Sequence, residues 1–560
     1  MPGWQWLVAA GSLALALLMI STAHPHERPT TLAGRSAVYA PRGVIATSQP
    51  LATAAGLAVL ERGGNAMEAA VTAAAVLNVV EPHMTGMGGD MFALVWVAGE
   101  KRLVGLNSSG RAGARMTREE LLRRGHRQVP EEGPESVTVP GALAGWAALL
   151  ERYGSIGLAQ ALVPAIKLAE DGFPVSPIIA QQWAAEEERL RRDPDARATY
   201  LLDGQKAPRV GEWFRNPDFA RTLRLIAEKG PGVLYGGELG RRIVEHLAQR
   251  GGFLTLDDLR NHRADWVEPI SVAFRGYRVW ELPPNGQGIA ALEMLRILEP
   301  FDLSAMGHNS AAYLHHLIEA KKLAFADLAR YVADPAHMRV SPERLLADDF
   351  IRQRRSQLDA ERAADHSEPG PAVTASETIY LSVADAQGNM VSFINSLFDT
   401  FGSGVVVPGT GFALQNRGAG FTLEPDHPNT VAPGKRPFHT IIPAFVTRPT
   451  PAGEEPWLSF GVMGGSMQPQ GHVQVLLNLL VFGMDIQQAI DAPRFRHLAG
   501  RRVALESPVS DEVRAALRAK GHEMADESRV SFGGAQAVRR LERGWVAGSD
   551  PRKDGLAAGH

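Results

Sequence analysis

The sequence predicts a protein of class α+β with antiparallel strands. Residues 377–393 have the pattern of two strands joined by a tight turn, because β-branched and apolar residues flank the run Asp-Ala-Gln-Gly-Asn. Residues 43–106 alternate short strand patterns with helical ones, and residues 140–345 are mainly helical. A hairpin together with interspersed helices is typical of layered folds that combine both types of structure.

Composition excludes several classes of function. The chain has 560 residues, of which 45% are hydrophobic and 21% are charged, as in ordinary globular proteins. Its formal net charge of -3 gives no reason to expect nucleic acid or an anionic membrane surface as a partner. There is no cysteine, so disulfides, thiolate metal sites and a cysteine nucleophile are excluded.

The N-terminal residues form the longest apolar run of the chain. Residues 5–20 are almost entirely apolar, and the small residues Ser21, Thr22 and Ala23 follow them. This pattern predicts a signal peptide over residues 1–23, although no Lys or Arg precedes the run, and it places the protein in the periplasm or outside the cell. The competing interpretation is a membrane anchor, because the run is only slightly shorter than a bilayer span. A membrane is thus a partner only if this segment is retained.

The next elements follow from start and stop signals. A strand over residues 43–50 leads to a helix over 51–62 that ends at Gly63-Gly64. Asn65 has the position of a helix cap, with Glu68 completing a capping box for an Ala-rich helix over 66–80. The glycine-rich run 83–90 precedes a strand over 91–96, which is the wrong order for a dinucleotide site.

Periodicity predicts further helices and strands later in the chain. Residues 309–334 predict a long amphipathic helix with Glu319 and Lys322 toward water. Strands are expected over 457–462 and 503–505, with a helix over 469–480 between them. The polar terminus over 550–560 predicts a loose end. None of the histidines His83, His439 and His472 has a partner at metal-ligand spacing, so no metal site is predicted.

Thr378 begins the predicted hairpin directly after a Pro/Gly-containing segment. If the chain were cut before it, Thr378 would become an N-terminal threonine with its own general base, since an α-amino group has a pKa of about 7.7–8.0. Threonine at the start of a strand is also common for structural reasons, because β-branched residues suit strands. The hairpin alone therefore leaves both interpretations open.

Eight motifs, in this order along about residues 40–550, decide between them. They are Gly63-Gly64-Asn65-Ala66, Gly88-Gly89-Asp90-Met91-Phe92, Ser109-Gly110-Arg111-Ala112, Val139-Pro140-Gly141, Thr378 with Asp385 and Gly388-Asn389, Phe401-Gly402-Ser403-Gly404, Pro433-Gly434-Lys435-Arg436-Pro437 and Gly464-Gly465-Ser466. With these motifs the chain resembles the gamma-glutamyltransferase family of N-terminal-nucleophile hydrolases.

The resemblance implies a fold and a maturation step. The expected fold is the four-layer αββα sandwich of N-terminal-nucleophile hydrolases. Cleavage between Glu377 and Thr378 is expected to give a large subunit, residues 24–377, and a small subunit, residues 378–560, which together build one catalytic domain. The partners are then a small-molecule amide substrate and the chain's own cleaved subunit, and no cofactor is needed.

The resemblance also assigns the reacting groups. Thr378 is expected to be the nucleophile, and the backbone N–H groups of Gly464 and Gly465 are expected to form the oxyanion hole, where glycine leaves the amides unobstructed. Ser396 has the position of a hydroxyl that hydrogen-bonds the nucleophile; alternatively, it is an ordinary strand serine.

Three further residues are expected to bind substrate. Arg111 lies in the motif whose arginine binds the substrate carboxylate, a role that suits the fork of a guanidinium. Aligning the motif on Ala112 instead places that position at Ser109, and an arginine after glycine is often a solvated surface residue. His439 and Thr440 replace a pair of serines that donate to the carboxylate; alternatively, His439 is a packing residue.

Two departures from the family pattern bear on the substrate. Gly420 stands where gamma-glutamyltransferases have an aspartate for the α-ammonium group, and Phe398 stands where they have an asparagine. A substrate with a carboxylate but without an ammonium group fits these changes best, and the runs around Phe401 and Gln415 are similar to those of the oxamate amidohydrolase-like branch. Two alternatives remain open: a true gamma-glutamyl transpeptidase or glutathione hydrolase, and an unprocessed, non-catalytic exported binding protein.

Overall fold

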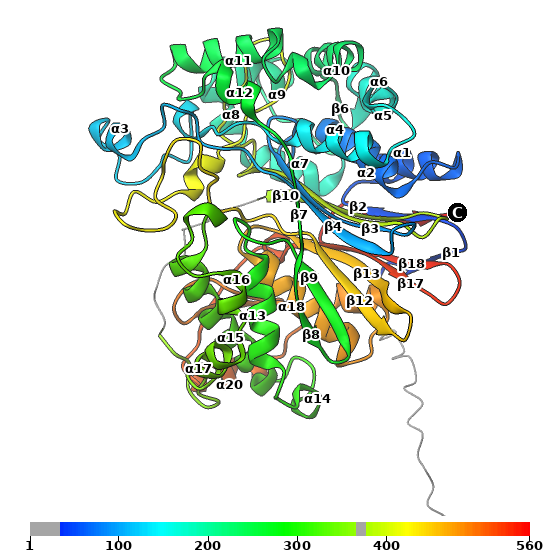
Figure 1. Ribbon diagram of the computed structural model, residues 1–560, viewed down its shortest axis with the longest axis vertical. Coiled ribbons are helices and arrows are strands. Elements are labelled where there is room, and N and C mark those ends of the chain that lie inside the picture. The colour runs from blue at the N-terminus through cyan, green and yellow to red at the C-terminus, as the bar shows by residue number, and fades with distance from the viewer. Residues whose placement is uncertain (1–33, 366–376) are drawn as a thin grey trace, which may run out of the picture.

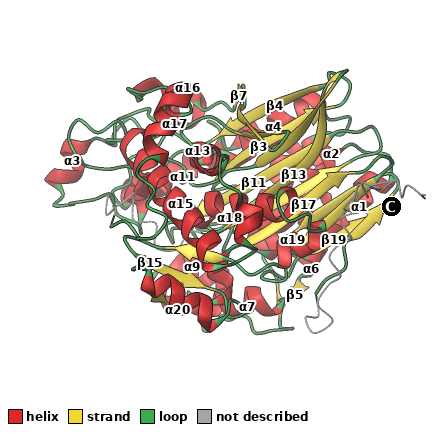
Figure 2. Cartoon of the chain, turned by 90° about the horizontal axis from the view of Figure 1, so that it is seen from below, coloured by secondary structure: helices red, strands yellow, loops and turns green. Residues whose placement is uncertain are grey.

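Two antiparallel sheets lie face to face, and helices cover the outer face of each (Figure 1). The computed structural model describes residues 34–365 and 377–560, so the predicted signal peptide lies outside the described residues. Seen from below, helices lie over the second sheet, and the strands of both sheets run behind them (Figure 2). Within the described ranges, no helix has the length and apolar character needed to cross a membrane.

The first sheet contains the predicted hairpin at its centre. In spatial order its strands are β19 (Leu556–Gly559), β2 (Val44–Thr47), β10 (Glu377–Ala384), β11 (Met390–Phe398), β3 (Asp90–Val97), β4 (Arg102–Ser108) and β7 (Asp265–Val267). The hairpin strands β10 and β11 thus lie between β2 and β3, which come from the N-terminal part of the chain.

The second sheet is built mainly from C-terminal strands. In spatial order these are β1 (Val38–Ala40), β18 (Trp545–Ser549), β17 (Gly534–Arg540), β13 (Gly453–Met463), β12 (Ala444–Thr450), β9 (Tyr277–Glu281) and β8 (Ile270–Phe274). Strand β13 lies opposite the hairpin, because β10 contacts β13 and β17 across the space between the sheets.

Two groups of helices cover the sheets. The group on the first sheet comprises α1 (Pro50–Glu61), α2 (Ala66–Val80), α4 (Ala142–Tyr153), α5 (Leu158–Ala161), α6 (Val163–Asp171), α7 (Pro177–Ala185), α8 (Glu187–Arg192), α9 (Pro194–Tyr200), α10 (Pro217–Lys229), α11 (Glu238–Gln249) and α12 (Leu256–Asn261). The group on the second sheet comprises α13 (Gly288–Leu298), α14 (Leu303–Met306), α15 (Ala311–Tyr331), α16 (Pro342–Leu345), α17 (Asp348–Arg355), α18 (Met467–Leu480), α19 (Ile486–Asp491) and α20 (Asp511–Ala519).

Small elements complete the chain. They are α3 (Arg118–Arg123), the 3-10 turns η1 (Pro134–Ser136), η2 (Pro231–Val233), η3 (Pro335–His337), η4 (Arg417–Gly420) and η5 (Arg529–Phe532), the strand pair β5 (Phe173–Pro174) and β6 (Trp213–Phe214), and a small sheet of β14 (Phe495–His497), β15 (Arg502–Leu505) and β16 (Glu523–Ala525).

Alternation along β10 distributes its side chains between two cores. Ile379 and Leu381 pack into the core under the first group of helices, whereas Tyr380 packs into the core between the two sheets. Successive side chains of a strand point to opposite faces, so the even-numbered positions of β10 face the second sheet. The position of Thr378 is therefore on the inner face of the first sheet.

The local signals in the sequence explain how the hairpin is fixed. Helix α2 begins with the predicted capping box, in which Asn65 accepts from the N–H of Glu68 and Glu68 accepts from the N–H of Asn65. In the hairpin turn, Asp385 Oδ1 accepts from the N–H groups of Gln387 and Asn389, each at 2.9 Å. Asp385 Oδ2 accepts from the N–H of Ala66 at 2.8 Å, which ties the turn to the start of α2.

Two sequence expectations are wrong. The terminus over 550–560 is ordered, because β19 pairs antiparallel with β2. Glu319 and Lys322 are buried rather than exposed, and Lys322 Nζ donates to Glu319 Oε1 at 2.8 Å. Burial of both charges is tolerated because the two groups are paired with each other.

Candidate active site

Thr378 lies at the start of β10, with its side chain fully buried on the inner face of the first sheet. Its hydroxyl donates to Ser396 Oγ of the neighbouring strand β11 at 3.1 Å. The register between the two strands shifts between Glu377 and Ile379, so the ladder is irregular at this residue. The hydroxyl is thus held in place beside a peptide bond at an irregular strand end.

Hydrogen bonds connect Thr378 to the glycine pair. Ser396 Oγ also accepts from Arg417 Nη2 at 3.3 Å, and Arg417 Nη1 donates to Thr440 Oγ1 at 2.8 Å. Gln287 Nε2 then donates to the carbonyl oxygens of Thr440, at 2.6 Å, and of Gly465, at 2.7 Å. We call Thr378, Ser396, Arg417, Thr440, Gln287 and Gly465 the nucleophile network.

The glycine pair forms a sharp turn between β13 and α18. Gly464 has a φ of 122° and Gly465 a φ of 55°, values that residues with a Cβ rarely adopt. Their carbonyl oxygens accept from the first N–H groups of the helix, those of Met467 and Gln468. Among the residues that the structure describes, neither glycine N–H has a backbone acceptor. Two such amides are suited to hold a negatively charged oxygen.

Arg417 is the charged member of the network. Its side chain is fully buried, and its guanidinium lies over the ring of Phe398, 4.1 Å from the ring centroid. Burial lowers the pKa of Arg417 to about 9, although the carboxylates of Asp90 and Asp399 oppose this shift. Phe398 has a φ of 85° and donates its N–H to Ser396 Oγ at 2.8 Å, so its backbone is held to the network.

Asp90 organises the other side of the site. Its Oδ1 accepts from the N–H groups of Gly110 and Gly141 and from Gln415 Nε2, and its Oδ2 accepts from His439 Nε2 at 2.9 Å. Burial raises the pKa of Asp90 to about 7, while the charge of Arg417 and the hydrogen bonds from Gly110, Gln415 and Gly141 lower it.

His439 is neutral and has both ring nitrogens engaged. Its Nδ1 accepts from the N–H of Ile441 at 3.3 Å, so Nε2 carries the proton that Asp90 accepts. Burial, followed by the charges of Arg417 and Arg436, holds the pKa of His439 well below its usual range. The ring N–H that was expected to donate to substrate is therefore directed at Asp90, and the substrate-binding role of His439 stays a prediction.

Among the described residues, no hydrogen bond joins Arg111 to a member of the nucleophile network. Its guanidinium lies 3.5 Å from carboxylate oxygens of Asp265 and of Asp334, donates to the carbonyl of Gly434, and has 41% of its side chain exposed. Ser109, the alternative position, is fully buried between Asn107 and Asn285. The carboxylate-binding role of Arg111 stays a prediction.

The structure therefore brings Thr378, Ser396, Thr440 and Gly465 together, and it adds residues that sequence reasoning missed. These are Arg417, Gln287, Asp90 and Gln415. For Arg417 a signal was available, since the run around Gln415 carries part of the family resemblance. For Gln287 no local pattern distinguishes it from other polar residues.

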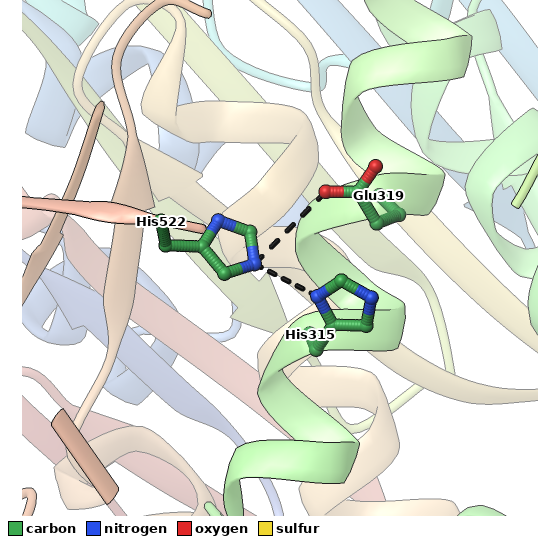
Figure 3. A group of neighbouring side chains, drawn as sticks. All are labelled: His315, Glu319 and His522. Atoms are coloured by element: carbon green, nitrogen blue, oxygen red, sulfur yellow. Dashed lines mark hydrogen bonds and ion pairs between the residues drawn. The ribbon is translucent and has the colours of Figure 1, made fainter. Parts of the chain in front are cut away.

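A second group of buried ionisable side chains lies on α15 and just before β16 (Figure 3). His315 and Glu319 project from α15 toward His522, and one ligand atom from each lies within 4.8 Å of the others. These residue types could hold a metal ion, and His315 and Glu319 are four residues apart on α15, so they lie on one face of the helix. His315 Nε2 is hydrogen-bonded to the carbonyl of Asp359 at 2.7 Å, so Nε2 carries the proton, and Nδ1 accepts from His522 Nε2 at 2.8 Å.

Hydrogen bonds and an ion pair engage most polar atoms of this group, whereas His522 Nδ1 is buried without a partner among the described residues. Glu319 Oε1 is neutralised by Lys322, and Glu319 Oε2 accepts from the N–H of Ala364 at 3.1 Å. Lys322 also donates to the carbonyl of Ala364 at 2.8 Å. An ammonium group on the carboxylate disfavours a second cation there, and the group instead fastens residues 359–364 to α15.

Comparisons with known proteins agree on one family. The model of the family described as gamma-glutamyltranspeptidase matches residues 52–560 of the chain. The chain is 39% identical to the glutathione hydrolase-like YwrD proenzyme of Bacillus subtilis, covering 93% of this chain and 99% of that protein. It is 36% identical to the oxamate amidohydrolase proenzyme of Klebsiella pneumoniae, covering 92% and 98% respectively. The solved structure of cephalosporin acylase from Bacillus halodurans is 44% identical, with a TM-score of 0.88 and coverage of 95% and 98%.

Proposed function

The chain belongs to the gamma-glutamyltranspeptidase family of self-cleaving amidohydrolases, and on this premise we propose that Thr378 is its nucleophile. Maturation would cut the chain between Glu377 and Thr378 into a large subunit, residues 24–377, and a small subunit, residues 378–560. The observation that supports this assignment is the nucleophile network, which joins the Thr378 hydroxyl to the turn at Gly464-Gly465. The relatives named above include proenzymes, which supports activation by cleavage.

The architecture fits this assignment. Helices, two face-to-face sheets and helices again follow one another in space, and we assign this order to the four-layer αββα sandwich of N-terminal-nucleophile hydrolases. Both subunits would contribute strands to each sheet, so they form one catalytic domain.

The proposed maturation step uses the chain's own hydroxyl. The Thr378 oxygen attacks the carbonyl carbon of Glu377, the C–N bond breaks, and the acyl group moves from nitrogen to oxygen as an ester. Water hydrolyses the ester, which leaves an α-carboxylate at Glu377, the new C-terminus, and a free α-amino group on Thr378. Ser396 would position the hydroxyl, to which it is hydrogen-bonded before cleavage.

The proposed catalytic cycle has two halves. The free amine of Thr378, with a pKa of about 7.7–8.0, takes the hydroxyl proton while the oxygen attacks the substrate amide. The N–H groups of Gly464 and Gly465 hold the oxyanion, and the amine leaves with the proton. Water or an acceptor amine then releases the acyl group from the threonine.

For the substrate we favour a small amide whose acyl part carries a carboxylate but no α-ammonium group. Gly420 and Phe398 lack the side-chain groups that would recognise the ammonium, and relatives named for oxamate and for cephalosporin share more of the sequence than several named as glutathione hydrolases. Glutathione hydrolysis is the second candidate, supported by those relatives at 30–31% identity and by the glutathione hydrolase-like YwrD proenzyme at 39%. An exported location is proposed from the apolar run over residues 5–20 alone.

Intact mass spectrometry of the full chain tests the nucleophile. The wild-type protein is expected to give two subunits, the smaller one starting at Thr378, while a Thr378→Ala variant stays one chain and hydrolyses no amide. Thr374→Ala is the matched control in the same segment and is expected to be processed like wild type. Cleavage that persists in Thr378→Ala, or a small subunit with another first residue, would contradict the assignment.

A further inference from the structure

Arg417 places a buried positive charge beside the candidate nucleophile. Its side chain has no exposure to solvent, and Ser396 Oγ is a hydrogen-bond partner of both Arg417 Nη2 and Thr378 Oγ1. Removing a guanidinium from water is unfavourable unless a negative group compensates it. The groups around Arg417 therefore indicate what kind of substrate group it can bind.

The protein itself supplies little compensation. Arg417 forms two hydrogen bonds, both to hydroxyl oxygens, and within residues 34–365 and 377–560 its Nε has no partner and no carboxylate pairs with it. Two acids lie close enough to influence its charge, but both are bound elsewhere. Asp90 accepts from four other donors, and Asp399 accepts from Asn416 Nδ2 at 2.6 Å.

Phe398 restricts how an anion can approach. Its ring stacks on the guanidinium and covers one face of it, so N–H groups at the edge of the guanidinium remain for hydrogen bonding. A carboxylate that meets this edge can accept two parallel hydrogen bonds. An ammonium group at the same place would meet the like charge of Arg417 and would find no acid at Gly420.

We propose that Arg417 binds the carboxylate of the acyl part of the substrate, and that the substrates are monoamides of short dicarboxylic acids. This inference rests on the proposed function of Thr378. Because a single hydroxyl bridges Thr378 and Arg417, the carboxylate and the amide carbonyl are separated by only a few carbon atoms. The charge of Arg417 selects against neutral and cationic acyl groups of the same length.

The test compares charged and neutral versions of one substrate. Oxalyl, succinyl and glutaryl p-nitroanilides and their methyl esters have the same carbon chains, and only the acids carry a charge. Wild-type enzyme is expected to prefer at least one acid over its ester in kcat/KM. In Arg417→Gln the ratio of acid to ester is expected to fall at least about 100-fold, mainly through KM, and Arg417→Lys is expected to restore part of it.

Processing is measured first, because Arg417 contacts Ser396. If Arg417→Gln is not cleaved, Arg417→Lys and inhibition of the wild-type enzyme replace it, with glutarate expected to compete and neutral glutaramide not to compete. A wild-type protein that fails to cleave itself overturns the proposed function. A processed wild-type enzyme that hydrolyses acids and esters equally, or hydrolyses none of them, overturns only the role of Arg417.

The variants also distinguish Arg417 from Arg111. Loss of the acid preference in Arg111→Gln but not in processed Arg417→Gln would identify Arg111 as the residue that binds the substrate carboxylate. This result would overturn the proposal. A fall in activity of Arg417→Gln that is equal for acid and ester would indicate a structural role and overturn it as well.

Discussion

Arg417 and Arg552 are both buried arginines, but their guanidinium groups have different neighbours. Arg552 Nε donates to Glu506 Oε1 at 2.8 Å, and its Nη1 donates to Asp550 Oδ1 at 3.1 Å. Asp550 also pairs with Arg494 at 2.7 Å. Burial alone would lower the pKa of Arg552, yet the two carboxylates raise it above its ordinary value.

Arg417 has hydroxyls where Arg552 has carboxylates, and its pKa moves in the opposite direction. Arg552, Arg494, Asp550 and Glu506 form a charge cluster that is compensated within the protein, as expected where buried charges serve the fold. A buried cation without a carboxylate partner therefore indicates a binding role, because the fold alone does not require such a cation.

Removing a carboxylate from the compensated cluster should have the largest effect. Asp550→Ala leaves Arg494 and Arg552 without a shared partner, and we expect the free energy of unfolding to fall by about 3–5 kcal/mol. Urea unfolding in the unprocessed Thr378→Ala background measures this without subunit separation. Arg417→Met in the same background should destabilise the protein less than Asp550→Ala. Equal losses would contradict the distinction between a structural and a binding arginine.

Acid should weaken the same cluster. Although burial opposes it, Arg494 and Arg552 lower the pKa of Asp550 to about 2 from an ordinary value of 3.8. A carboxyl group with a depressed pKa stabilises the fold above its unfolded pKa, so this contribution is complete above about pH 4 and is lost as pH falls toward 2. It amounts to about 2 kcal/mol. Unfolding between pH 5 and 2 should show this loss in the Thr378→Ala protein and not when Asp550→Asn is added.

A carboxylate introduced near Arg417 should give this arginine the kind of acidic partner that Arg552 has. Gly420→Asp restores the acid of gamma-glutamyltransferases in the same short turn as Arg417, and we expect activity on gamma-glutamyl amides to rise relative to short carboxylated amides. A Cβ at this position would lie 2.6 Å from the carbonyl oxygen of Phe438, so the variant should lose at least about 1 kcal/mol of stability.

Gly420→Ala separates the two effects of that change. It has the same steric conflict without the charge, so it should lose similar stability without any gain on gamma-glutamyl amides. Equal relative rates on the two substrate classes in the Asp and Ala variants would remove the charge at this position as the cause of the specificity.

Removing Arg111 from its ion pairs should have the smallest effect, because its own side chain is 41% exposed although Asp334 is buried. Arg111 is partly solvated, and Asp334 keeps a donor in the N–H of Arg436 when Arg111 is changed. Arg111→Gln should therefore alter the free energy of unfolding by less than about 1 kcal/mol. A loss of 2 kcal/mol or more in the same urea assay would contradict this expectation. It would show that a partly exposed arginine can matter as much for stability as the buried ones.

Sequence patterns predicted the parts of the fold that depend on local signals. The hairpin, helix α2 with its capping box and the strand before the glycine pair are confirmed because turn residues, caps and periodicity act over a few residues. The family, and with it the class of self-cleaving amidohydrolases, is confirmed by the match over residues 52–560. The subunit boundary and the roles of the site residues stay predictions.

What the sequence did not reveal depends on distant partners. Lys322 was expected in water because its helix is amphipathic, but it is buried against a segment more than 40 residues later in the chain. The C-terminal residues have no strong strand pattern, and β19 forms because β2 offers an edge. Arg417 follows the same logic: only the fold shows that it lies beside Thr378 and is excluded from water.

The strand order of the first sheet has a consequence for how the mature enzyme holds together. After a cut before Thr378, β11 and β10 from Thr378 onward would belong to one polypeptide while the flanking β2 and β3 belong to the other. Neither polypeptide can leave without opening hydrogen-bonded ladders on both sides of the hairpin. The mature heterodimer should thus be insensitive to dilution, and its two polypeptides should not exchange with those of another molecule unless both unfold.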